Sequence, residues 1–157
     1  MLKLKNLKCE YLINPIGIGT IKPRFSWIIE SDKRNVVQTS YEIHVTKDKD
    51  FKNLLWSSGV VESDASAHVY YVGLKLQSSS RYYYKVKISD NHGEISDFCE
   101  AGFFETTLFT SDEWKARFIT AEGEEDGKNS KGTLLRKEFK ISKEIESAGV
   151  YATALHV

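Results

Sequence analysis

The sequence contains few prolines, which break regular secondary structure, and few cysteines, which could form disulfide bonds. Its 157 residues include two prolines, which is few for a β-protein rich in turns, and two cysteines. Cys9 and Cys99 are too few for the disulfide framework of a small secreted domain. A bridge between adjacent edge strands is one interpretation of this pair. We favour the other interpretation, two reduced and packed thiols in a reducing compartment.

The sequence also lacks an excess of charge of either sign and lacks long apolar runs. Lys and Arg together number 22, as do Asp and Glu, so the net charge at pH 7 is zero. Without a basic field the chain has little to hold a phosphate backbone, which argues against a nucleic-acid partner. No apolar run is long enough to span a membrane, and residues 1–6 lack the apolar core and cleavage site of a secretion signal. We therefore expect a cytoplasmic protein with no membrane partner.

The chain does contain aromatic residues and strands with a period of two. In the stretch from Arg81 to Asp90, one face carries Tyr82, Tyr84, Val86 and Ile88, and the other carries Tyr83, Lys85, Lys87 and Ser89. This alternation predicts a half-buried strand in a mostly antiparallel sheet. Its spacing from Leu76 is that of strand F of an immunoglobulin-like sandwich, where a tyrosine bonds its hydroxyl to nearby backbone. We assign that role to Tyr82.

Shorter runs of the same kind precede and follow this strand. Alternation predicts strands at 2–12, with a bulge near Asn6, and at 24–29, 38–46, 51–56, 60–61, 68–72 and 98–106. About seven short strands at this spacing indicate a β-sandwich. The predicted fold class is therefore all-β, an immunoglobulin/fibronectin-III-like sandwich over residues 1–107. Its expected core includes Trp27, Tyr41, Tyr82, Tyr84, Val86 and Phe104.

From residue 108 the pattern changes. Strand-like runs at 114–119, 134–141 and 150–157 flank a polar run at 122–132, and Ser111 or Asp112 is placed to cap a short turn ending at Trp114. We predict that 108–157 is a linker followed by the incomplete start of a second β-sandwich. An apolar strand pattern up to Val157 suggests an N-terminal piece of a longer protein.

Several stretches, in order along the chain, resemble the N-terminal region of bacterial α-L-rhamnosidases of glycoside hydrolase family 78. The matching segments are 14–18 (NPIGI), 23–27 (PRFSW), 38–43 (QTSYEI), 55–61 (LWSSGVV), 81–86 (RYYYKV), 104–106 (FET) and 112–116 (DEWKA). The sequence departs from the family at Tyr84, where the family usually has Trp, and near Phe98, where a second Trp is frequent. Both positions keep an aromatic ring.

The resemblance implies a fibronectin-type-III-like module at the N-terminus of an enzyme. In the family, terminal α-L-rhamnose is cleaved with inversion by acidic residues of a downstream (α/α)₆ barrel, which this chain lacks. No catalytic motif of the family falls on a residue of this sequence. We therefore expect no catalytic residue and no cofactor, and we expect the downstream domains of the same polypeptide to be the partners.

Other candidate sites have simpler interpretations. A metal site needs converging ligands; His44 and His68 could approach on neighbouring strands, but surface histidines are the simpler interpretation. Glu122, Glu124, Glu125 and Asp126 lack the regular spacing of a calcium loop. The Gly17-Ile18-Gly19 segment lacks the strand, helix and third glycine of a dinucleotide site. We expect no metal ligand among these residues.

Four aromatic residues are harder to bury in the predicted sandwich: Trp56, Tyr71 (or its neighbour Tyr70), Tyr83 and Trp114. Exposed rings can stack on sugar or dock a neighbouring domain, and we favour docking. The leading hypothesis is a non-catalytic accessory module of an α-L-rhamnosidase, not an enzyme by itself. The alternatives are a carbohydrate-binding module for rhamnosylated glycans and a free-standing protein-interaction domain.

Overall fold

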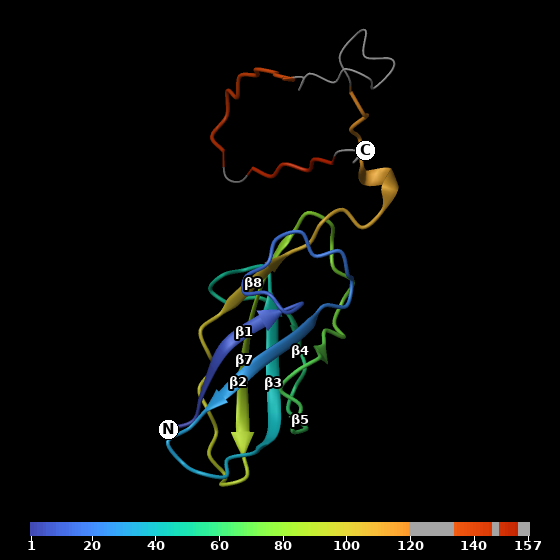
Figure 1. The fold of residues 1–157 in the computed structure, drawn as a ribbon. Helices are drawn as coiled ribbons and strands as arrows, with labels where there is room; N and C mark the ends of the chain where they lie inside the picture. The colour runs from blue at the N-terminus through green and yellow to red at the C-terminus, as the bar shows by residue number, and fades with distance from the viewer. Residues whose placement is uncertain (120–133, 146–147, 154–157) are drawn as a thin grey trace. The chain divides into compact units, whose positions relative to one another are not determined.

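The computed structural model describes residues 1–119, 134–145 and 148–153 (Figure 1). The chain divides into two units, Met1–Trp114 and Lys115–Val157. All named elements lie in the first unit, in the order β1 Lys3–Cys9, β2 Arg24–Glu30, β3 Gln38–Thr46, β4 Leu54–Ser57, β5 Val61–Glu62, β6 Val69–Tyr70, β7 Arg81–Asp90, β8 Gly102–Glu105 and the 3₁₀ turn η1 Ser111–Glu113. The described part of the chain contains no helix with the length and apolar character needed to cross a lipid bilayer.

The strands form two sheets. One has the order β1-β2-β6, and the other has the order β4-β3-β7-β8, with β5 also paired to β3. Every pairing between named strands is antiparallel. Figure 1 shows β1 and β2 crossing in front of β3 and β7, so the sheets are stacked layers. This confirms the predicted all-β sandwich.

Strand β7 is the central strand of the larger sheet. Tyr82, Tyr84, Val86 and Ile88 are each at most 1% exposed, while the residues between them are half-buried. The Tyr82 hydroxyl accepts a hydrogen bond of 2.7 Å from the backbone N–H of Gln77, just before the strand. The tyrosine thus fastens the β6–β7 loop to its own strand, as the spacing predicted.

Aromatic rings from both sheets meet in the core. Phe25 of β2 stacks on Tyr84 of β7 with ring centroids 4.5 Å apart, and Phe104 of β8 packs against both rings. Trp27 is 3% exposed, and Val86 and Phe104 are fully buried. These are positions of the expected core.

Tyr41 departs from that expectation, because it is only half-buried and lies edge-on against Trp27 at the margin of the core. The register of β3 against β7 shifts between Gln38 and Ser40. The shift turns Thr39 to solvent and Gln38 and Ser40 inward, whereas unbroken alternation with the buried Ile43 and Val45 would place Thr39 inward.

Two edge strands of the sandwich, β1 in one sheet and β8 in the other, have irregular edges. The register of β1 shifts between Lys5 and Lys8, and Asn6 has φ 51°, which confirms the bulge predicted near Asn6. Strand β8 is shorter than the predicted 98–106. Beyond it, Ile18 forms a parallel bridge with Thr106, and the Pro15 carbonyl accepts from the N–H of Glu105. A covered or bulged edge resists pairing with another chain.

The first unit extends past the predicted boundary at residue 107. The Glu113 carboxylate accepts hydrogen bonds from the N–H groups of Phe109 and Thr110 and from the Ser78 hydroxyl. Thr110 occupies the N-cap of η1, so the prediction of Ser111 or Asp112 as cap was wrong. The reciprocal bonds between Thr110 and Glu113 make a capping box.

The predicted strands beyond residue 113 do not form in the part of the second unit that the structure describes. Residues 115–119, 134–145 and 148–153 carry no strand. The polar run 122–132, with its four acids, lies outside the described residues. The second sandwich remains a prediction.

Candidate functional site

The four rings predicted for docking or sugar stacking do not form one exposed surface. Tyr71 is 1% exposed, which corrects its prediction as a surface ring. Its N–H donates to Pro23 and its hydroxyl donates to the Leu74 carbonyl at 2.9 Å. Burial raises the pKa of Tyr71 to about 12. Burial alternates from Val69 to Val72, so Tyr71 lies on the same inward face as Val69, just beyond the end of β6.

Trp56 is half-buried against Tyr71, with ring centroids 5.0 Å apart and nearly perpendicular planes. A Cβ added at Gly73 would lie 2.6 Å from the Trp56 ring and 2.5 Å from the Tyr71 hydroxyl. The three residues therefore form a packed corner. This corner explains why the backbone at position 73 requires glycine.

Tyr83 and Trp114 are half-buried as well, at separate places. Tyr83 lies on the outer face of β7 beside Phe103, with centroids 6.4 Å apart. Trp114 closes η1, where its N–H donates to the Ser111 carbonyl. Neither ring joins Trp56, so the predicted set is dispersed over the module.

The outer face of β3 and β7 carries a ladder of charges and rings. Glu42 contacts His44 Nε2 at 2.6 Å and Lys87 Nζ at 2.8 Å. The hydrogen bond from Lys87 lowers the pKa of Glu42. The His44 ring packs on Phe98, and the Lys85 ammonium lies 4.7 Å from the centroid of the same ring. These contacts satisfy the polar groups of the ladder and favour a stabilising role.

His44 and His68 do not approach each other as a metal pair. His44 belongs to β3 in the larger sheet, while His68 lies next to β6 of the smaller sheet and contacts the Tyr11 hydroxyl at 3.1 Å. Within the described ranges, no group of three or more His, Cys, Asp or Glu side chains could hold a metal ion. Cys9 and Cys99 are free thiols, and burial raises the pKa of both.

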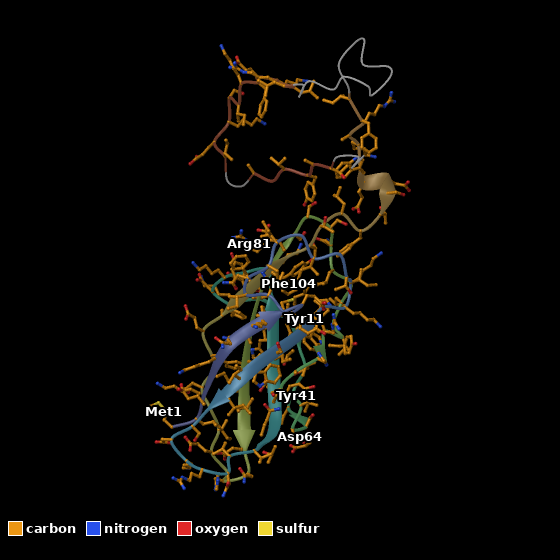
Figure 2. The ribbon with its side chains drawn as sticks, in the orientation of Figure 1. Met1, Tyr11, Tyr41, Asp64, Arg81 and Phe104 are labelled. Carbon is orange, nitrogen blue, oxygen red and sulfur yellow. The ribbon has the colours of Figure 1, made fainter. Side chains whose placement is uncertain are left out.

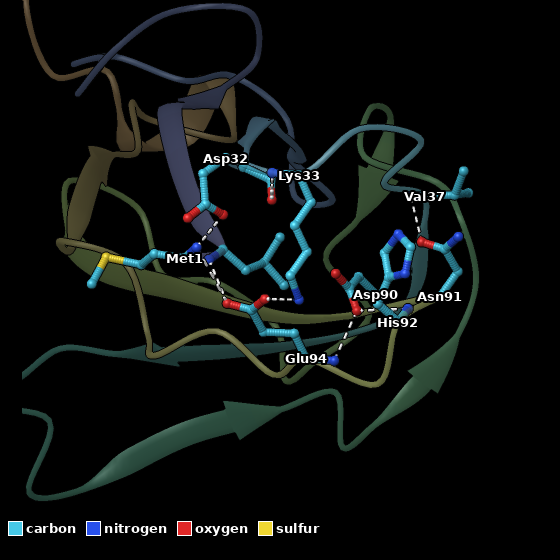
Figure 3. A network of polar contacts seen from close by, with 10 residues as sticks. Met1, Asp32, Lys33, Val37, Asp90, Asn91, His92 and Glu94 are labelled. Atoms are coloured by element: carbon cyan, nitrogen blue, oxygen red, sulfur yellow. Dashed lines mark hydrogen bonds and ion pairs between the residues drawn. The ribbon is translucent and has the colours of Figure 1, made fainter.

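The end of the sandwich that holds the N-terminus is polar. The Met1 ammonium contacts Asp32 and Glu94, and Lys33 Nζ lies 2.7 Å from Glu94 (Figure 3). The Asp90 carboxylate accepts the backbone N–H groups of residues 92 and 94. The hydrogen bond from Lys33 lowers the pKa of Glu94. This network joins the N-terminus to the β7–β8 turn.

The opposite end, where the chain leaves the sandwich, is apolar and exposed. We define the exit surface as five loop side chains that are 48–73% exposed, namely Leu12, Ile16, Ile21, Val72 and Leu74. Two shallow hollows lie here, of about 360 Å³ and about 270 Å³, and their linings meet at Thr20 and Ile21. Figure 2 shows Tyr11 near this end and Met1 at the other. The sequence analysis missed this surface, because isolated apolar residues in loops have no periodicity.

Two stacked antiparallel sheets with a tyrosine-fastened loop before β7 define the class, an immunoglobulin-like β-sandwich. The family model of the N-terminal immunoglobulin domain of Rha78A-like proteins matches residues 4–110. The chain belongs to this family, which confirms the resemblance seen in the sequence.

Similar proteins are much longer than this chain. An α-L-rhamnosidase of Alteromonas sp. (strain LOR) is 31% identical over 92% of this chain and 17% of its own length, and one of Formosa agariphila is 29% identical over 90% and 17%. The crystal structure of the Streptomyces avermitilis α-L-rhamnosidase in complex with L-rhamnose superimposes with a TM-score of 0.73 at 30% identity. That match covers 77% of this chain and 12% of that one. The chain thus spans about a sixth of the length of its curated relatives.

Proposed function

We propose that this chain is a non-catalytic accessory module at the N-terminal side of an α-L-rhamnosidase, and that it supports the downstream part of the enzyme. The observation that carries the proposal is the family match over residues 4–110 together with the small share of each relative that the chain covers. The partner is the rest of the same polypeptide, and the substrate of the whole enzyme is a glycoside with terminal α-L-rhamnose.

Three hollows lined by described residues support a role without chemistry. An inverting glycosidase needs two carboxyl groups about 6.5–9.5 Å apart. The hollow of about 400 Å³ beside β1 has one carboxylate in its lining, Glu100, and the hollow beside Leu12 and Ile16 also has one, Glu10. The hollow at Val72 and Leu74 has none.

Deletion of residues 1–114 from the full-length enzyme tests the supporting role. We expect the melting temperature of the remainder to fall and its half-life at a fixed elevated temperature to shorten, because the contact with the module is lost. The fraction of enzyme still folded should retain turnover of an aryl α-L-rhamnoside. An unchanged melting temperature and half-life would contradict the proposal.

A titration of the chain with L-rhamnose separates this function from that of a carbohydrate-binding module. Tryptophan fluorescence reports on the half-buried Trp56 and Trp114. We expect no saturable change up to high millimolar sugar, because Tyr71 and Gly73 close the corner around Trp56. Saturable binding at micromolar to low-millimolar sugar would favour the carbohydrate-binding module instead.

A further inference from the structure

The exposed apolar side chains of the first unit are concentrated at one end. The first unit has fourteen exposed large hydrophobic residues, and eight of them lie in the segments 10–22 and 70–75. Those eight are Tyr11, Leu12, Ile13, Ile16, Ile21, Tyr70, Val72 and Leu74. Single exposed apolar residues are ordinary, whereas a group of them rimmed by polar residues marks an interaction site.

This is also the end at which the polypeptide leaves the sandwich. After β8, the Thr107 N–H donates to the Ile18 carbonyl, and the Thr107 carbonyl accepts from the N–H of Ser79. A Cβ at Gly19 would lie 3.8 Å from the Thr107 side chain. The segment after β8 therefore runs between the two loops that carry the exit surface, and the first unit ends at Trp114, next to Glu113, which bonds to Ser78 of one of these loops.

One side of the exit surface carries positive charge, while on the other side Glu10 is paired with Arg24. The hollow at Val72 and Leu74 is lined by Lys22 and Lys75, both exposed, and has no acidic residue in its lining. A partner that fits presents an apolar contact with carboxylates at its edge. At the opposite end, the acids Asp32 and Glu94 are already paired with the N-terminus and Lys33.

From these three observations we infer that the exit surface docks the part of the same polypeptide that follows the module. The inference rests on the proposed function and specifies which face of the module meets its partner. The occupant is the downstream chain, because the relatives continue for about five-sixths of their length beyond a region of this size and the exit places that chain next to the surface. Of the ring set predicted from the sequence, Tyr71 lines the hollow at Val72 and Leu74, where it is buried beneath the exposed side chains.

Hydrogen–deuterium exchange of the full-length enzyme, compared with that of the isolated chain, tests the inference. We expect the amides of residues 10–22 and 70–76 to exchange about tenfold more slowly in the full-length protein. Burial of one aliphatic side chain stabilises the docked state by at least about 1.4 kcal/mol, and about 1.4 kcal/mol already shifts the equilibrium between docked and open states tenfold. The turns at 31–37 and 91–97 should exchange equally in both proteins. Equal exchange at the exit surface, or protection confined to the opposite end, would overturn the inference.

Two variants of matched exposure sharpen the test. Val72 is 70% exposed and lies on the exit surface, while Ile95 is 68% exposed and lies in the β7–β8 connection at the other end. Val72→Asp in the full-length enzyme should remove the protection, and Ile95→Asp should leave it intact. Both variants should leave the melting temperature of the isolated chain unchanged. Identical effects of the two variants on protection would overturn the inference, as would a concentration-dependent dimer of the isolated chain through this face.

These experiments distinguish failure of the inferred docking surface from failure of the proposed function. If deletion of residues 1–114 lowers the melting temperature of the enzyme but the exit surface shows no protection, the docking face is wrong and the supporting role stands. If the isolated chain hydrolyses rhamnosides, the proposed function fails whatever the exchange pattern shows.

Discussion

The indole N–H of Trp27 donates a hydrogen bond of 2.9 Å to the side-chain oxygen of Gln38, and this bond joins the two sheets through the core. The Gln38 amide group in turn donates to the carbonyls of Ser63 and Ala65 at 3.0 and 2.9 Å. Gln38 is 2% exposed, so one buried amide connects β2, β3 and the β5–β6 connection.

We predict that Gln38→Leu lowers the free energy of unfolding by about 2–4 kcal/mol, because it leaves a buried indole donor and two carbonyls without partners. The measurement is urea unfolding followed by tryptophan fluorescence. Gln77→Leu is the matched control, since Gln77 is exposed and its loss should cost little. Equal effects of the two substitutions would mean that the buried network contributes nothing.

Two neighbouring tyrosines should respond oppositely to loss of their hydroxyl groups. The Tyr82 hydroxyl accepts from Gln77, so Tyr82→Phe should destabilise the fold by about 1 kcal/mol. The Tyr84 hydroxyl is buried and has no partner among the described residues, so Tyr84→Phe should be neutral or stabilising. Thermal unfolding of both variants checks the sign, and a destabilised Tyr84→Phe would show that its hydroxyl is bonded.

Gly73→Ala should disrupt the Trp56–Tyr71 corner. The added methyl group meets both rings at less than 3 Å, and overpacking of this kind costs about 1–3 kcal/mol. We expect a lower melting temperature together with a shifted tryptophan emission. Gly19→Ala is the control, because its methyl group meets only the Thr107 side chain, at 3.8 Å. An unchanged melting temperature for Gly73→Ala would contradict the packed corner.

The ion pair between Glu10 and Arg24 should make stability depend on pH in the acid range. Hydrogen bonds from Arg24 hold the pKa of Glu10 below its ordinary value of 4.5. Because the pKa in the folded state is the lower one, the stabilisation is fully present above pH 4.5 and is lost as pH falls through the folded pKa. Relative to the wild type, Glu10→Gln should be less stable at pH 7 and should lose less stability between pH 5 and pH 3, as measured by urea unfolding. Parallel pH profiles would exclude a contribution from this pair.

The sequence predicts the sandwich well where one face of a strand is apolar. Strand β7 is the clearest case, because its four inward side chains alternate with lysines and no irregularity interrupts them. The tyrosine that fastens the preceding loop was also predictable, since its spacing from Leu76 is fixed by the fold.

Elsewhere, tertiary structure decides what the sequence pattern leaves ambiguous. The register shift in β3 exposes Thr39 and buries Ser40, and no local residue signals that reversal. Tyr70 and Tyr71 are adjacent and chemically identical, and Tyr71 is the buried one because it shares the inward face of Val69, which is set by the pairing of β6 with β2. The exit surface could not be predicted from the sequence pattern for a related reason. Whether an apolar loop residue is buried or exposed depends on its contacts with residues that are distant in the sequence.

The most direct test of the central claim is an assay of the isolated 157-residue chain on an aryl α-L-rhamnoside, at enzyme concentrations where the full-length protein gives rapid release of the chromophore. We predict no release above the rate in buffer alone, because under the proposed function the bond-breaking acids belong to the downstream part of the enzyme. Turnover by the isolated chain that disappears when Glu10 or Glu100 is changed to Gln would contradict this account.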